Sequence, residues 1–222
     1  MTMSKSIPMV DLPKIHAPYQ SDLDKAVLSV VHSGGYIGGT VVKDFEARAA
    51  SYLGAPVIGV GNGTDALQIA LMALDIKAGD EVIVPAFTYA ASAEVIGLLG
   101  AVAVWCDVNE STFTIDPDSV KSVLSDKTAA IIAVHLYGQC ADIEALENVA
   151  PDIPIVEDTA QAFGAVFTTG KYKGRNAGTV GSFGTFSFFP TKNLGALGDG
   201  GAIASTNASL LTKAKSIASH GQ

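Results

Sequence analysis

The stretch GVGNGTDALQIALMAL, residues 59–74, joins the end of an apolar run to a glycine-rich turn and a helical pattern. We expect Gly61 and Gly63 to let the backbone turn tightly between the two. The helix would begin with free backbone N–H groups at Gly63, Thr64, Asp65 and Ala66, and its dipole favours an anion at that end. A strand followed by such a turn and a helix is the first half of a βαβ unit, so this stretch predicts an α/β fold.

The turn also has an interpretation that requires no ligand. Thr64 or Asp65 would serve as an ordinary N-cap residue, as short polar side chains often do. Neither the GxxxxGK[ST] pattern of a P-loop nor the GxGxxG pattern of a dinucleotide-binding turn is present. Taken alone, the stretch leaves an anion site and a plain helix cap equally open.

Short apolar runs and helical patterns alternate from residue 56 onward. The runs are rich in Val and Ile and are continuous, which is typical of strands buried on both faces of a mainly parallel sheet. The predicted strands lie at 56–60, 81–87, 101–108, 129–138, 153–160, 183–189 and 200–206, with helical segments at 64–76, 90–100, 116–125 and 142–150. This order predicts a three-layer α/β/α domain in which helices cover both faces of the sheet.

The two ends of the chain differ from this pattern. Helical stretches at 20–34 and 43–54 dominate residues 1–55, which we expect to form an N-terminal helical segment before the βα region of residues 56–222. The last stretch, LLTKAKSIASHGQ, begins a helix that no further strand follows. This end looks like an interruption rather than the finish of a domain.

The composition limits the classes of partner. Of the 222 residues, 48% are hydrophobic, which is enough for one large domain. The formal net charge of −8 argues against nucleic acid, whose phosphates attract a basic surface. Cys106 and Cys140 form no CxxC pattern and are expected to be reduced thiols in the cytoplasm. We also expect no membrane partner, because no apolar run reaches the roughly 18 residues of a spanning helix and no secretory signal is present.

The stretch IPIVEDTAQAFGA, residues 153–165, ends a predicted strand with two adjacent acids, Glu157 and Asp158. Adjacent strand residues face opposite ways, so only one of the two can point toward a given ligand. Gln161 follows Asp158 by three residues and would share its side at the start of a helix. The alternatives are a further helix cap and a carboxylate at the carboxyl end of a strand, where open α/β sheets bind ligands.

Two more side chains that are suited to binding or catalysis follow predicted strand ends. Tyr89, in VPAFTYAAS, can stack on a flat ligand or pack in the core. His135, in AVHLYGQ, is better explained as a hydrogen-bonded structural residue than as a general base. The remaining histidines are scattered without the spacing of metal ligands, so we expect no metal site.

The stretch GTFSFFPTKNLGALGDGGA, residues 184–202, places Lys192 between an aromatic strand and a glycine-rich turn. A surface lysine normally lies among other polar residues. An ammonium group that is buried without a partner is costly and tends to lose its charge. A neutral lysine amine is a nucleophile that forms Schiff bases with carbonyl compounds.

Together these features match what pyridoxal phosphate needs from a protein. The phosphate would bind the helix N-terminus, and the ring would stack on the aromatic side chain. The ring nitrogen would pair with the aspartate, and the aldehyde would bond the lysine. An unrelated nucleotide-binding protein, the competing interpretation, would leave Lys192 without a role.

Four motifs, GNGTDAL, VIVPAFTYAAS, EDTAQAFGA and SFFPTKNLGALGDGGAI, resemble in sequence and order those of the DegT/DnrJ/StrS family of nucleotide-sugar aminotransferases. The resemblance implies the pyridoxal-phosphate transferase fold of type I, as in aspartate aminotransferase. It implies that Lys192 is the Schiff-base lysine and proton carrier, and that Asp158 pairs with the ring nitrogen. It further implies cofactor contacts from Gly63, Thr64, Asp65, Tyr89, Gln161 and Ser187.

The resemblance also implies a reaction. Family members transfer an amino group from L-glutamate to a nucleotide-linked keto-sugar in amino-sugar and polysaccharide biosynthesis. They are homodimers with a small C-terminal domain, which we expect beyond residue 222. The KNLGALGDGG turn resembles the branch that acts on 3-keto sugars, and the alternatives are the C-4 aminating branch and a non-catalytic binding or regulatory relative. We expect Tyr36, in the SGGYIGG loop, to contact the substrate.

Overall fold

The computed structural model describes residues 7–221. The chain forms two compact units that divide between Asp44 and Phe45. This division falls earlier in the chain than the boundary that we predicted after residue 55. Ala49 and Leu53 account for the difference, because both are buried in the core of the second unit.

The first unit is helical. It contains α1 (Leu12–His16), the 3-10 turn η1 (Ala17–Tyr19), α2 (Gln20–Ser33) and the start of α3 (Thr40–Leu53). Helix α1 begins after Asp11, whose carboxylate accepts a hydrogen bond from the Lys14 N–H at 3.1 Å. Helix α2 ends at Gly34, whose left-handed backbone conformation (φ 66°) is typical of a helix C-terminus.

The second unit contains one sheet of seven strands in the order β1-β7-β6-β5-β4-β2-β3. Strand β7 runs antiparallel to both of its neighbours, β1 and β6, and the other pairs are parallel. The mainly parallel sheet predicted from the apolar runs is therefore confirmed. The strands are β1 (Val57–Val60), β2 (Glu81–Pro85), β3 (Val102–Cys106), β4 (Thr128–Val134), β5 (Ile155–Asp158), β6 (Phe183–Ser187) and β7 (Gly201–Ala204).

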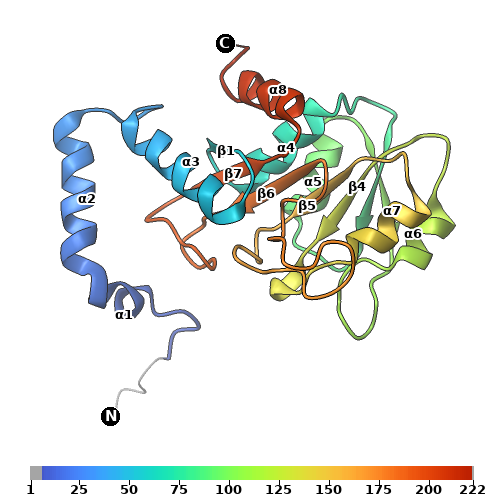
Figure 1. The fold of residues 1–222 in the computed structure, drawn as a ribbon, viewed down its shortest axis with the longest axis horizontal. Coiled ribbons are helices and arrows are strands. Elements are labelled where there is room, and N and C mark those ends of the chain that lie inside the picture. Colours follow the sequence, from blue (N-terminus) through green and yellow to red (C-terminus); the bar gives the residue numbers. More distant parts are fainter. Residues whose placement is uncertain (1–6, 222) are drawn as a thin grey trace, which may run out of the picture. The chain divides into compact units, whose positions relative to one another are not determined.

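Helices cover both faces of this sheet, which confirms the three-layer arrangement (Figure 1). One face packs against α4 (Gly63–Ala73), α5 (Ala91–Leu98) and α8 (Ala208–Ala218), and the other against α6 (Pro117–Val123) and α7 (Ile143–Val149). Neighbouring strand residues belong to opposite cores: Ile132 faces α4 and α5, whereas Ile131 faces α6 and α7. This alternation explains why the strands are apolar throughout.

Most helices of the second unit begin at a short polar side chain. Asp116, Asp142 and Asn207 cap α6, α7 and α8 by accepting backbone hydrogen bonds. The segment after Asp158 differs from prediction. Residues 159–165 form turns rather than the expected start of a helix.

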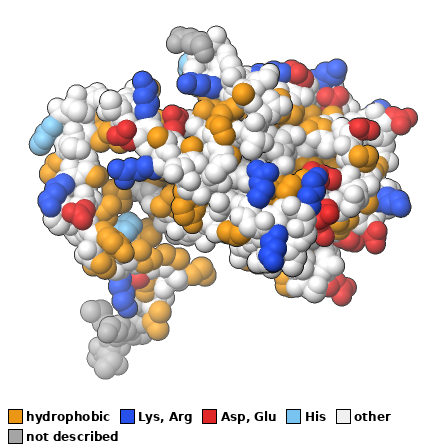
Figure 2. Space-filling model, viewed as in Figure 1, with side chains coloured by type: hydrophobic (Ala, Val, Ile, Leu, Met, Phe, Trp, Pro, Cys, Tyr) orange, Lys and Arg blue, Asp and Glu red, His pale blue; other side chains and the backbone are white. Residues whose placement is uncertain are grey.

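The second unit carries charged side chains of both signs on the face that Figure 2 shows. On the face seen in Figure 2, basic side chains of this unit lie next to acidic ones, an arrangement that gives no extended basic surface on that face. Within residues 7–221, none of the helices combines the length and the apolar character needed to cross a membrane.

Candidate active site

A cavity of about 460 Å³ lies where the carboxyl ends of β4, β5 and β6 meet the N-terminus of α4. The segment after β2 and the loop after β6 complete its wall. Open α/β sheets typically bind ligands at this edge, beyond the carboxyl ends of their strands. All eight residues for which we predicted cofactor contacts line the cavity: Gly63, Thr64, Asp65, Tyr89, Asp158, Gln161, Ser187 and Lys192.

The N-terminus of α4 lies at this cavity with two N–H groups that have no partner among residues 7–221. The N-cap residue is Asn62, not Thr64 or Asp65, and its side-chain oxygen accepts a hydrogen bond from the Asp65 N–H at 2.8 Å. The Ala66 N–H bonds to the carbonyl of Asn62. The N–H groups of Gly63 and Thr64 therefore remain for an anion, together with the Thr64 and Ser187 hydroxyls on the cavity wall.

The two glycines of this turn have a different role from the one expected. Neither Gly61 nor Gly63 has a positive φ, so the tight turn does not require them. A Cβ atom at Gly63 would lie 2.6 Å from Cβ of Ser187, and one at Gly61 would lie 2.5 Å from a carboxylate oxygen of Asp65. Gly63 thus allows the start of α4 to approach the end of β6 closely, so that both contribute to one anion-binding wall.

Asp158 is the acid of the adjacent pair that faces this cavity. The residue is only 5% exposed. Its carboxylate accepts hydrogen bonds from the Ser92 hydroxyl at 2.8 Å and from the Ala160 N–H at 3.1 Å. No lysine or arginine among the described residues pairs with it. A buried carboxylate without a cationic partner is suited to a ligand that carries a proton on nitrogen.

Glu157 faces the opposite side of the sheet, as strand alternation requires. Its carboxylate accepts hydrogen bonds from Nε2 of His135 and from the N–H groups of Gly178, Val180 and Gly181, at 2.7–2.9 Å. Nδ1 of His135 accepts a hydrogen bond from the Ala141 N–H at 2.9 Å. His135 is therefore a hydrogen-bonded structural residue, as expected, and is not directed at the cavity.

Gln161 is oriented by the backbone of a neighbouring loop. Its Oε1 accepts a hydrogen bond from the Tyr137 N–H at 2.8 Å. Tyr137 has the left-handed conformation (φ 55°) that side chains other than glycine and asparagine rarely adopt. With Oε1 occupied, the amide N–H groups of Gln161 remain available as donors for a ligand in the cavity.

Lys192 and Tyr89 supply the other two features of the cavity wall. Lys192 follows β6, and its side chain is half-buried rather than buried as the flanking apolar residues suggested. It forms no ion pair with the described acidic residues. Tyr89 is 72% exposed, which leaves its ring available for stacking on a planar ligand and excludes the alternative of a core tyrosine.

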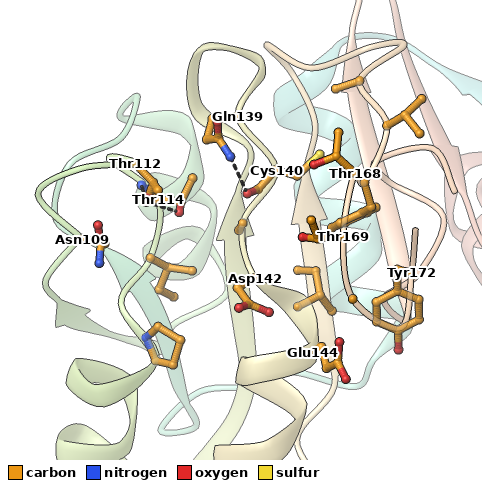
Figure 3. A pocket seen from close by; sticks show the side chains of 18 of the residues that line it. Asn109, Thr112, Thr114, Gln139, Cys140, Asp142, Glu144, Thr168, Thr169 and Tyr172 are labelled. Atoms are coloured by element: carbon orange, nitrogen blue, oxygen red, sulfur yellow. Dashed lines mark hydrogen bonds between the residues drawn. The ribbon is translucent and has the colours of Figure 1, made fainter. Parts of the chain in front are cut away.

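A larger cavity of about 580 Å³ lies among the loops after β3 and β4 and residues 165–172 (Figure 3). Its polar groups are mostly engaged with their neighbours. Gln139 donates to the carbonyl of Cys140, Thr112 bonds with Thr114, and Asp142 caps α7. Its wall contains no lysine, arginine or histidine. The smaller cavity, which has a lysine side chain and backbone N–H donors on its wall, is therefore the better candidate for an active site.

Sequence reasoning missed several residues around the smaller cavity. Asn62 carries a detectable signal, because it stands three residues before Asp65 at the start of a helical pattern. Thr88 and Ser92 lie within the quoted VPAFTYAAS motif, but nothing in the sequence indicates that they approach Asp158. Tyr36 belongs to the first unit, where its hydroxyl donates to the carbonyl of Val31 at 3.2 Å, and its predicted substrate contact stays a prediction.

Solved structures share this fold over nearly the whole chain. The structure of S. venezuelae DesV in complex with a ketimine intermediate is 38% identical, with a TM-score of 0.92 over 99% of this chain and 58% of that one. The structure of NtdA from Bacillus subtilis with bound cofactor PMP is 30% identical, with a TM-score of 0.85 over 97% of this chain and 49% of that one. The fold is that of the pyridoxal-phosphate aminotransferases, as predicted.

The chain belongs to the DegT/DnrJ/EryC1/StrS aminotransferase family, whose model matches residues 19–222. A UDP-2-acetamido-2-deoxy-3-oxo-D-glucuronate aminotransferase from Pseudomonas aeruginosa is 43% identical over 97% of this chain and 60% of its own length. A UDP-N-acetyl-3-dehydro-alpha-D-glucosamine 3-aminotransferase from Acidithiobacillus ferrooxidans is 39% identical over 100% of this chain and 59% of its own. The chain thus spans about three fifths of the length of these relatives.

Pyridoxal 5'-phosphate is the cofactor of this family, and the cavity fits it. The free N–H groups of Gly63 and Thr64 suit the phosphate, and the buried carboxylate of Asp158 suits a protonated ring nitrogen. The exposed face of Tyr89 suits the ring, and the amine of Lys192 suits the aldehyde.

Proposed function

We propose that this chain is the cofactor-binding part of an aminotransferase that acts on a nucleotide-linked keto-sugar. The observation that supports this most directly is the convergence, on one cavity, of two free helix N–H groups, a buried carboxylate and a lysine amine. Each group has a counterpart on pyridoxal phosphate. When bound, the cofactor supplies a conjugated ring that takes up the electron pair released as a substrate Cα–H bond breaks.

Residues of the chain would bind the cofactor and transfer the proton. Gly63, Thr64 and Ser187 hold the phosphate and so fix the position of the cofactor. Asp158 would keep the ring nitrogen protonated, and Lys192 would hold the cofactor and then, as a free amine, take up the proton released from Cα of the donor substrate. Gln161 donates a hydrogen bond to the ring oxygen through its amide.

We further propose that the acceptor is a 3-keto sugar and that L-glutamate is the amino donor. The two relatives described above are named for 3-oxo and 3-dehydro sugars, and a dTDP-3-amino-3,6-dideoxy-alpha-D-galactopyranose transaminase from Aneurinibacillus thermoaerophilus is 44% identical over 97% of this chain. The KNLGALGDGG turn favours the same branch. We also propose that the protein is a homodimer and that it lies in the cytoplasm. The two free cysteines are in keeping with that compartment.

The visible absorption spectrum of the chain mixed with pyridoxal phosphate tests this proposal. We expect an absorption band from covalently attached cofactor that decreases when L-glutamate is added. The band should be absent from Lys192→Ala and retained by Lys215→Ala, which removes an exposed lysine on α8. A band that persists in Lys192→Ala would contradict the assignment of the attachment site.

The identity of the acceptor sugar is tested with the chain after its treatment with L-glutamate. A nucleotide-linked 3-keto sugar should restore the band, whereas the 4-keto isomer should not. Restoration by the 4-keto isomer alone would assign the chain to the C-4 branch and leave the cofactor chemistry unchanged.

A further inference from the structure

Two hydrogen bonds link the side chains of Thr88, Ser92 and Asp158, from the edge of the cavity to the Asp158 carboxylate. The Ser92 hydroxyl lies 2.8 Å from Oδ2 of Asp158 and 3.0 Å from the hydroxyl of Thr88. Ser92 is fully buried at the start of α5, and Thr88 lines the cavity in the loop after β2. The link joins two segments that are 66 residues apart in the sequence, so it is a tertiary contact.

The direction of these hydrogen bonds follows from the number of protons that each side chain can donate. A carboxylate only accepts, so the single hydroxyl proton of Ser92 is donated to Asp158. Ser92 must then accept its second hydrogen bond, and Thr88 is the donor. The result is a relay in which the Thr88 hydroxyl donates to Ser92 and Ser92 donates to Asp158.

This use of Ser92 differs from what a helical serine ordinarily does. Serine in a helix commonly turns its hydroxyl toward a carbonyl of the preceding turn. Ser92 bonds instead to the side chains of Thr88 and Asp158. Its hydroxyl is one of only two hydrogen-bond donors to the carboxylate of Asp158 among the described residues, the other being the Ala160 N–H. Ser92 thus restricts the carboxylate in orientation as well as stabilising its charge.

We propose that Ser92, supported by Thr88, is a positioning residue that acts through Asp158 on the ring nitrogen of the cofactor. This inference rests on the proposed function, because it takes the ligand of Asp158 to be pyridoxal phosphate. With its carboxylate held by Ser92 and Ala160, Asp158 presents a fixed negative charge at the cavity. Without Ser92, the carboxylate loses a donor and is free to rotate away from the ring nitrogen.

The test compares two ligands in equilibrium dialysis. One is pyridoxal phosphate, and the other is its deaza analogue, in which a C–H group replaces the ring nitrogen. The analogue keeps the phosphate and the aldehyde but offers nothing to Asp158. We expect Ser92→Ala to weaken the binding of pyridoxal phosphate about tenfold, the effect of losing a hydrogen bond to a charged group. The binding of the deaza analogue should change less than about twofold.

Three matched variants accompany Ser92→Ala. Thr88→Val removes the outer hydroxyl of the relay at nearly constant volume and should weaken only the binding of pyridoxal phosphate, by less than Ser92→Ala does. Thr88→Ser keeps the hydroxyl and should bind both ligands as the wild type does. Ser187→Ala acts at the phosphate, which both ligands carry, and should weaken both equally.

The outcomes separate this inference from the proposed function. Equal weakening of both ligands by Ser92→Ala, or weakening of neither, would overturn the positioning role while leaving the cofactor assignment intact. A wild-type chain that binds neither ligand would overturn both proposals. Loss of pyridoxal phosphate binding alone in Ser92→Ala, with Thr88→Ser unaffected, would support the relay.

Discussion

Nε2 of His135 lies 2.8 Å from Oε2 of Glu157, and neither side chain is exposed to solvent. Because Nδ1 of His135 accepts a hydrogen bond, Nε2 carries the proton and donates it to the carboxylate. The pair joins the ends of β4 and β5 beneath the cavity, where the adjacent residues Val134 and Asp158 line its wall. The side of the sheet away from the ligand thus fixes the strand ends that form the site.

The carboxylate of Glu157 should be important for stability. Glu157→Gln replaces an acceptor oxygen with an NH₂ group that faces backbone N–H donors, leaving buried polar groups unpaired. We expect a loss of about 3 kcal/mol in the free energy of unfolding, measured by urea denaturation. Glu110→Gln, the same change at an exposed position, should stay within about 0.5 kcal/mol of wild type. Equal stability of the two variants would show that the network is dispensable.

The same carboxylate should make the free energy of unfolding depend on pH. Burial alone would raise the pKa of Glu157, but hydrogen bonds from His135, Gly181 and Gly178 outweigh it and hold the pKa below its ordinary value of 4.5. A depressed pKa contributes stability that is present above the unfolded-state pKa and is lost as the pH falls through the folded-state pKa. The stability difference between wild type and Glu157→Gln should therefore be constant above about pH 5 and should shrink below about pH 4. Urea denaturation at a series of pH values checks this, and a difference that grows on acidification would contradict it.

The strands were predictable because both of their faces are buried, so that an apolar run marks each one. The reversed direction of β7 was not predictable, because apolar character carries no information about strand direction. Strand alternation indicated that only one of Glu157 and Asp158 could face a ligand, and the motif resemblance selected Asp158. The Ser92 contact depends on how α5 packs against the end of β5, which local sequence does not encode.

Gly63 should be intolerant of even the smallest side chain. Its missing Cβ would lie 2.6 Å from Cβ of Ser187, so Gly63→Ala must separate α4 from the end of β6. We expect a loss of about 2 kcal/mol in unfolding free energy and weaker binding of pyridoxal phosphate. Gly97→Ala is the control, because Gly97 lies in α5 with nothing within 4 Å of the added Cβ. It should be neutral or stabilising by up to about 1 kcal/mol. An equally stable Gly63→Ala would mean that the two segments do not need their close approach.

The two cysteines should be poorly reactive in the folded chain. Burial, followed by the charge of Asp107, raises the pKa of Cys106 to about 12, and burial, followed by the charge of Glu157, raises that of Cys140 to about 11. At pH 8 the thiolate fraction is then small. Iodoacetamide should label the native chain at least about 100-fold more slowly than the urea-unfolded chain, as followed by mass spectrometry. Rapid labelling of Cys140 in the native chain would show that its loop opens to solvent.

Gln161 should bind the cofactor through its amide donor rather than through its oxygen. Its Oε1 already accepts a hydrogen bond from the Tyr137 N–H, and no described residue accepts one from its NH₂ group. Gln161→Glu keeps an acceptor for Tyr137 but removes the donor and adds a negative charge to the cavity. We expect stability to change by less than about 1 kcal/mol. Pyridoxal phosphate should bind at least about tenfold more weakly in equilibrium dialysis.

Gln139→Glu is the matched control for this change. It makes the same substitution at an exposed glutamine on the wall of the larger cavity, so its affinity for pyridoxal phosphate should equal that of wild type. Weaker binding in both variants would indicate a general effect of added negative charge. Undiminished binding in Gln161→Glu would show that the amide of Gln161 donates nothing to the cofactor. Weakening in Gln161→Glu alone would assign the hydrogen bond to that amide, because the Tyr137 contact that orients it is retained.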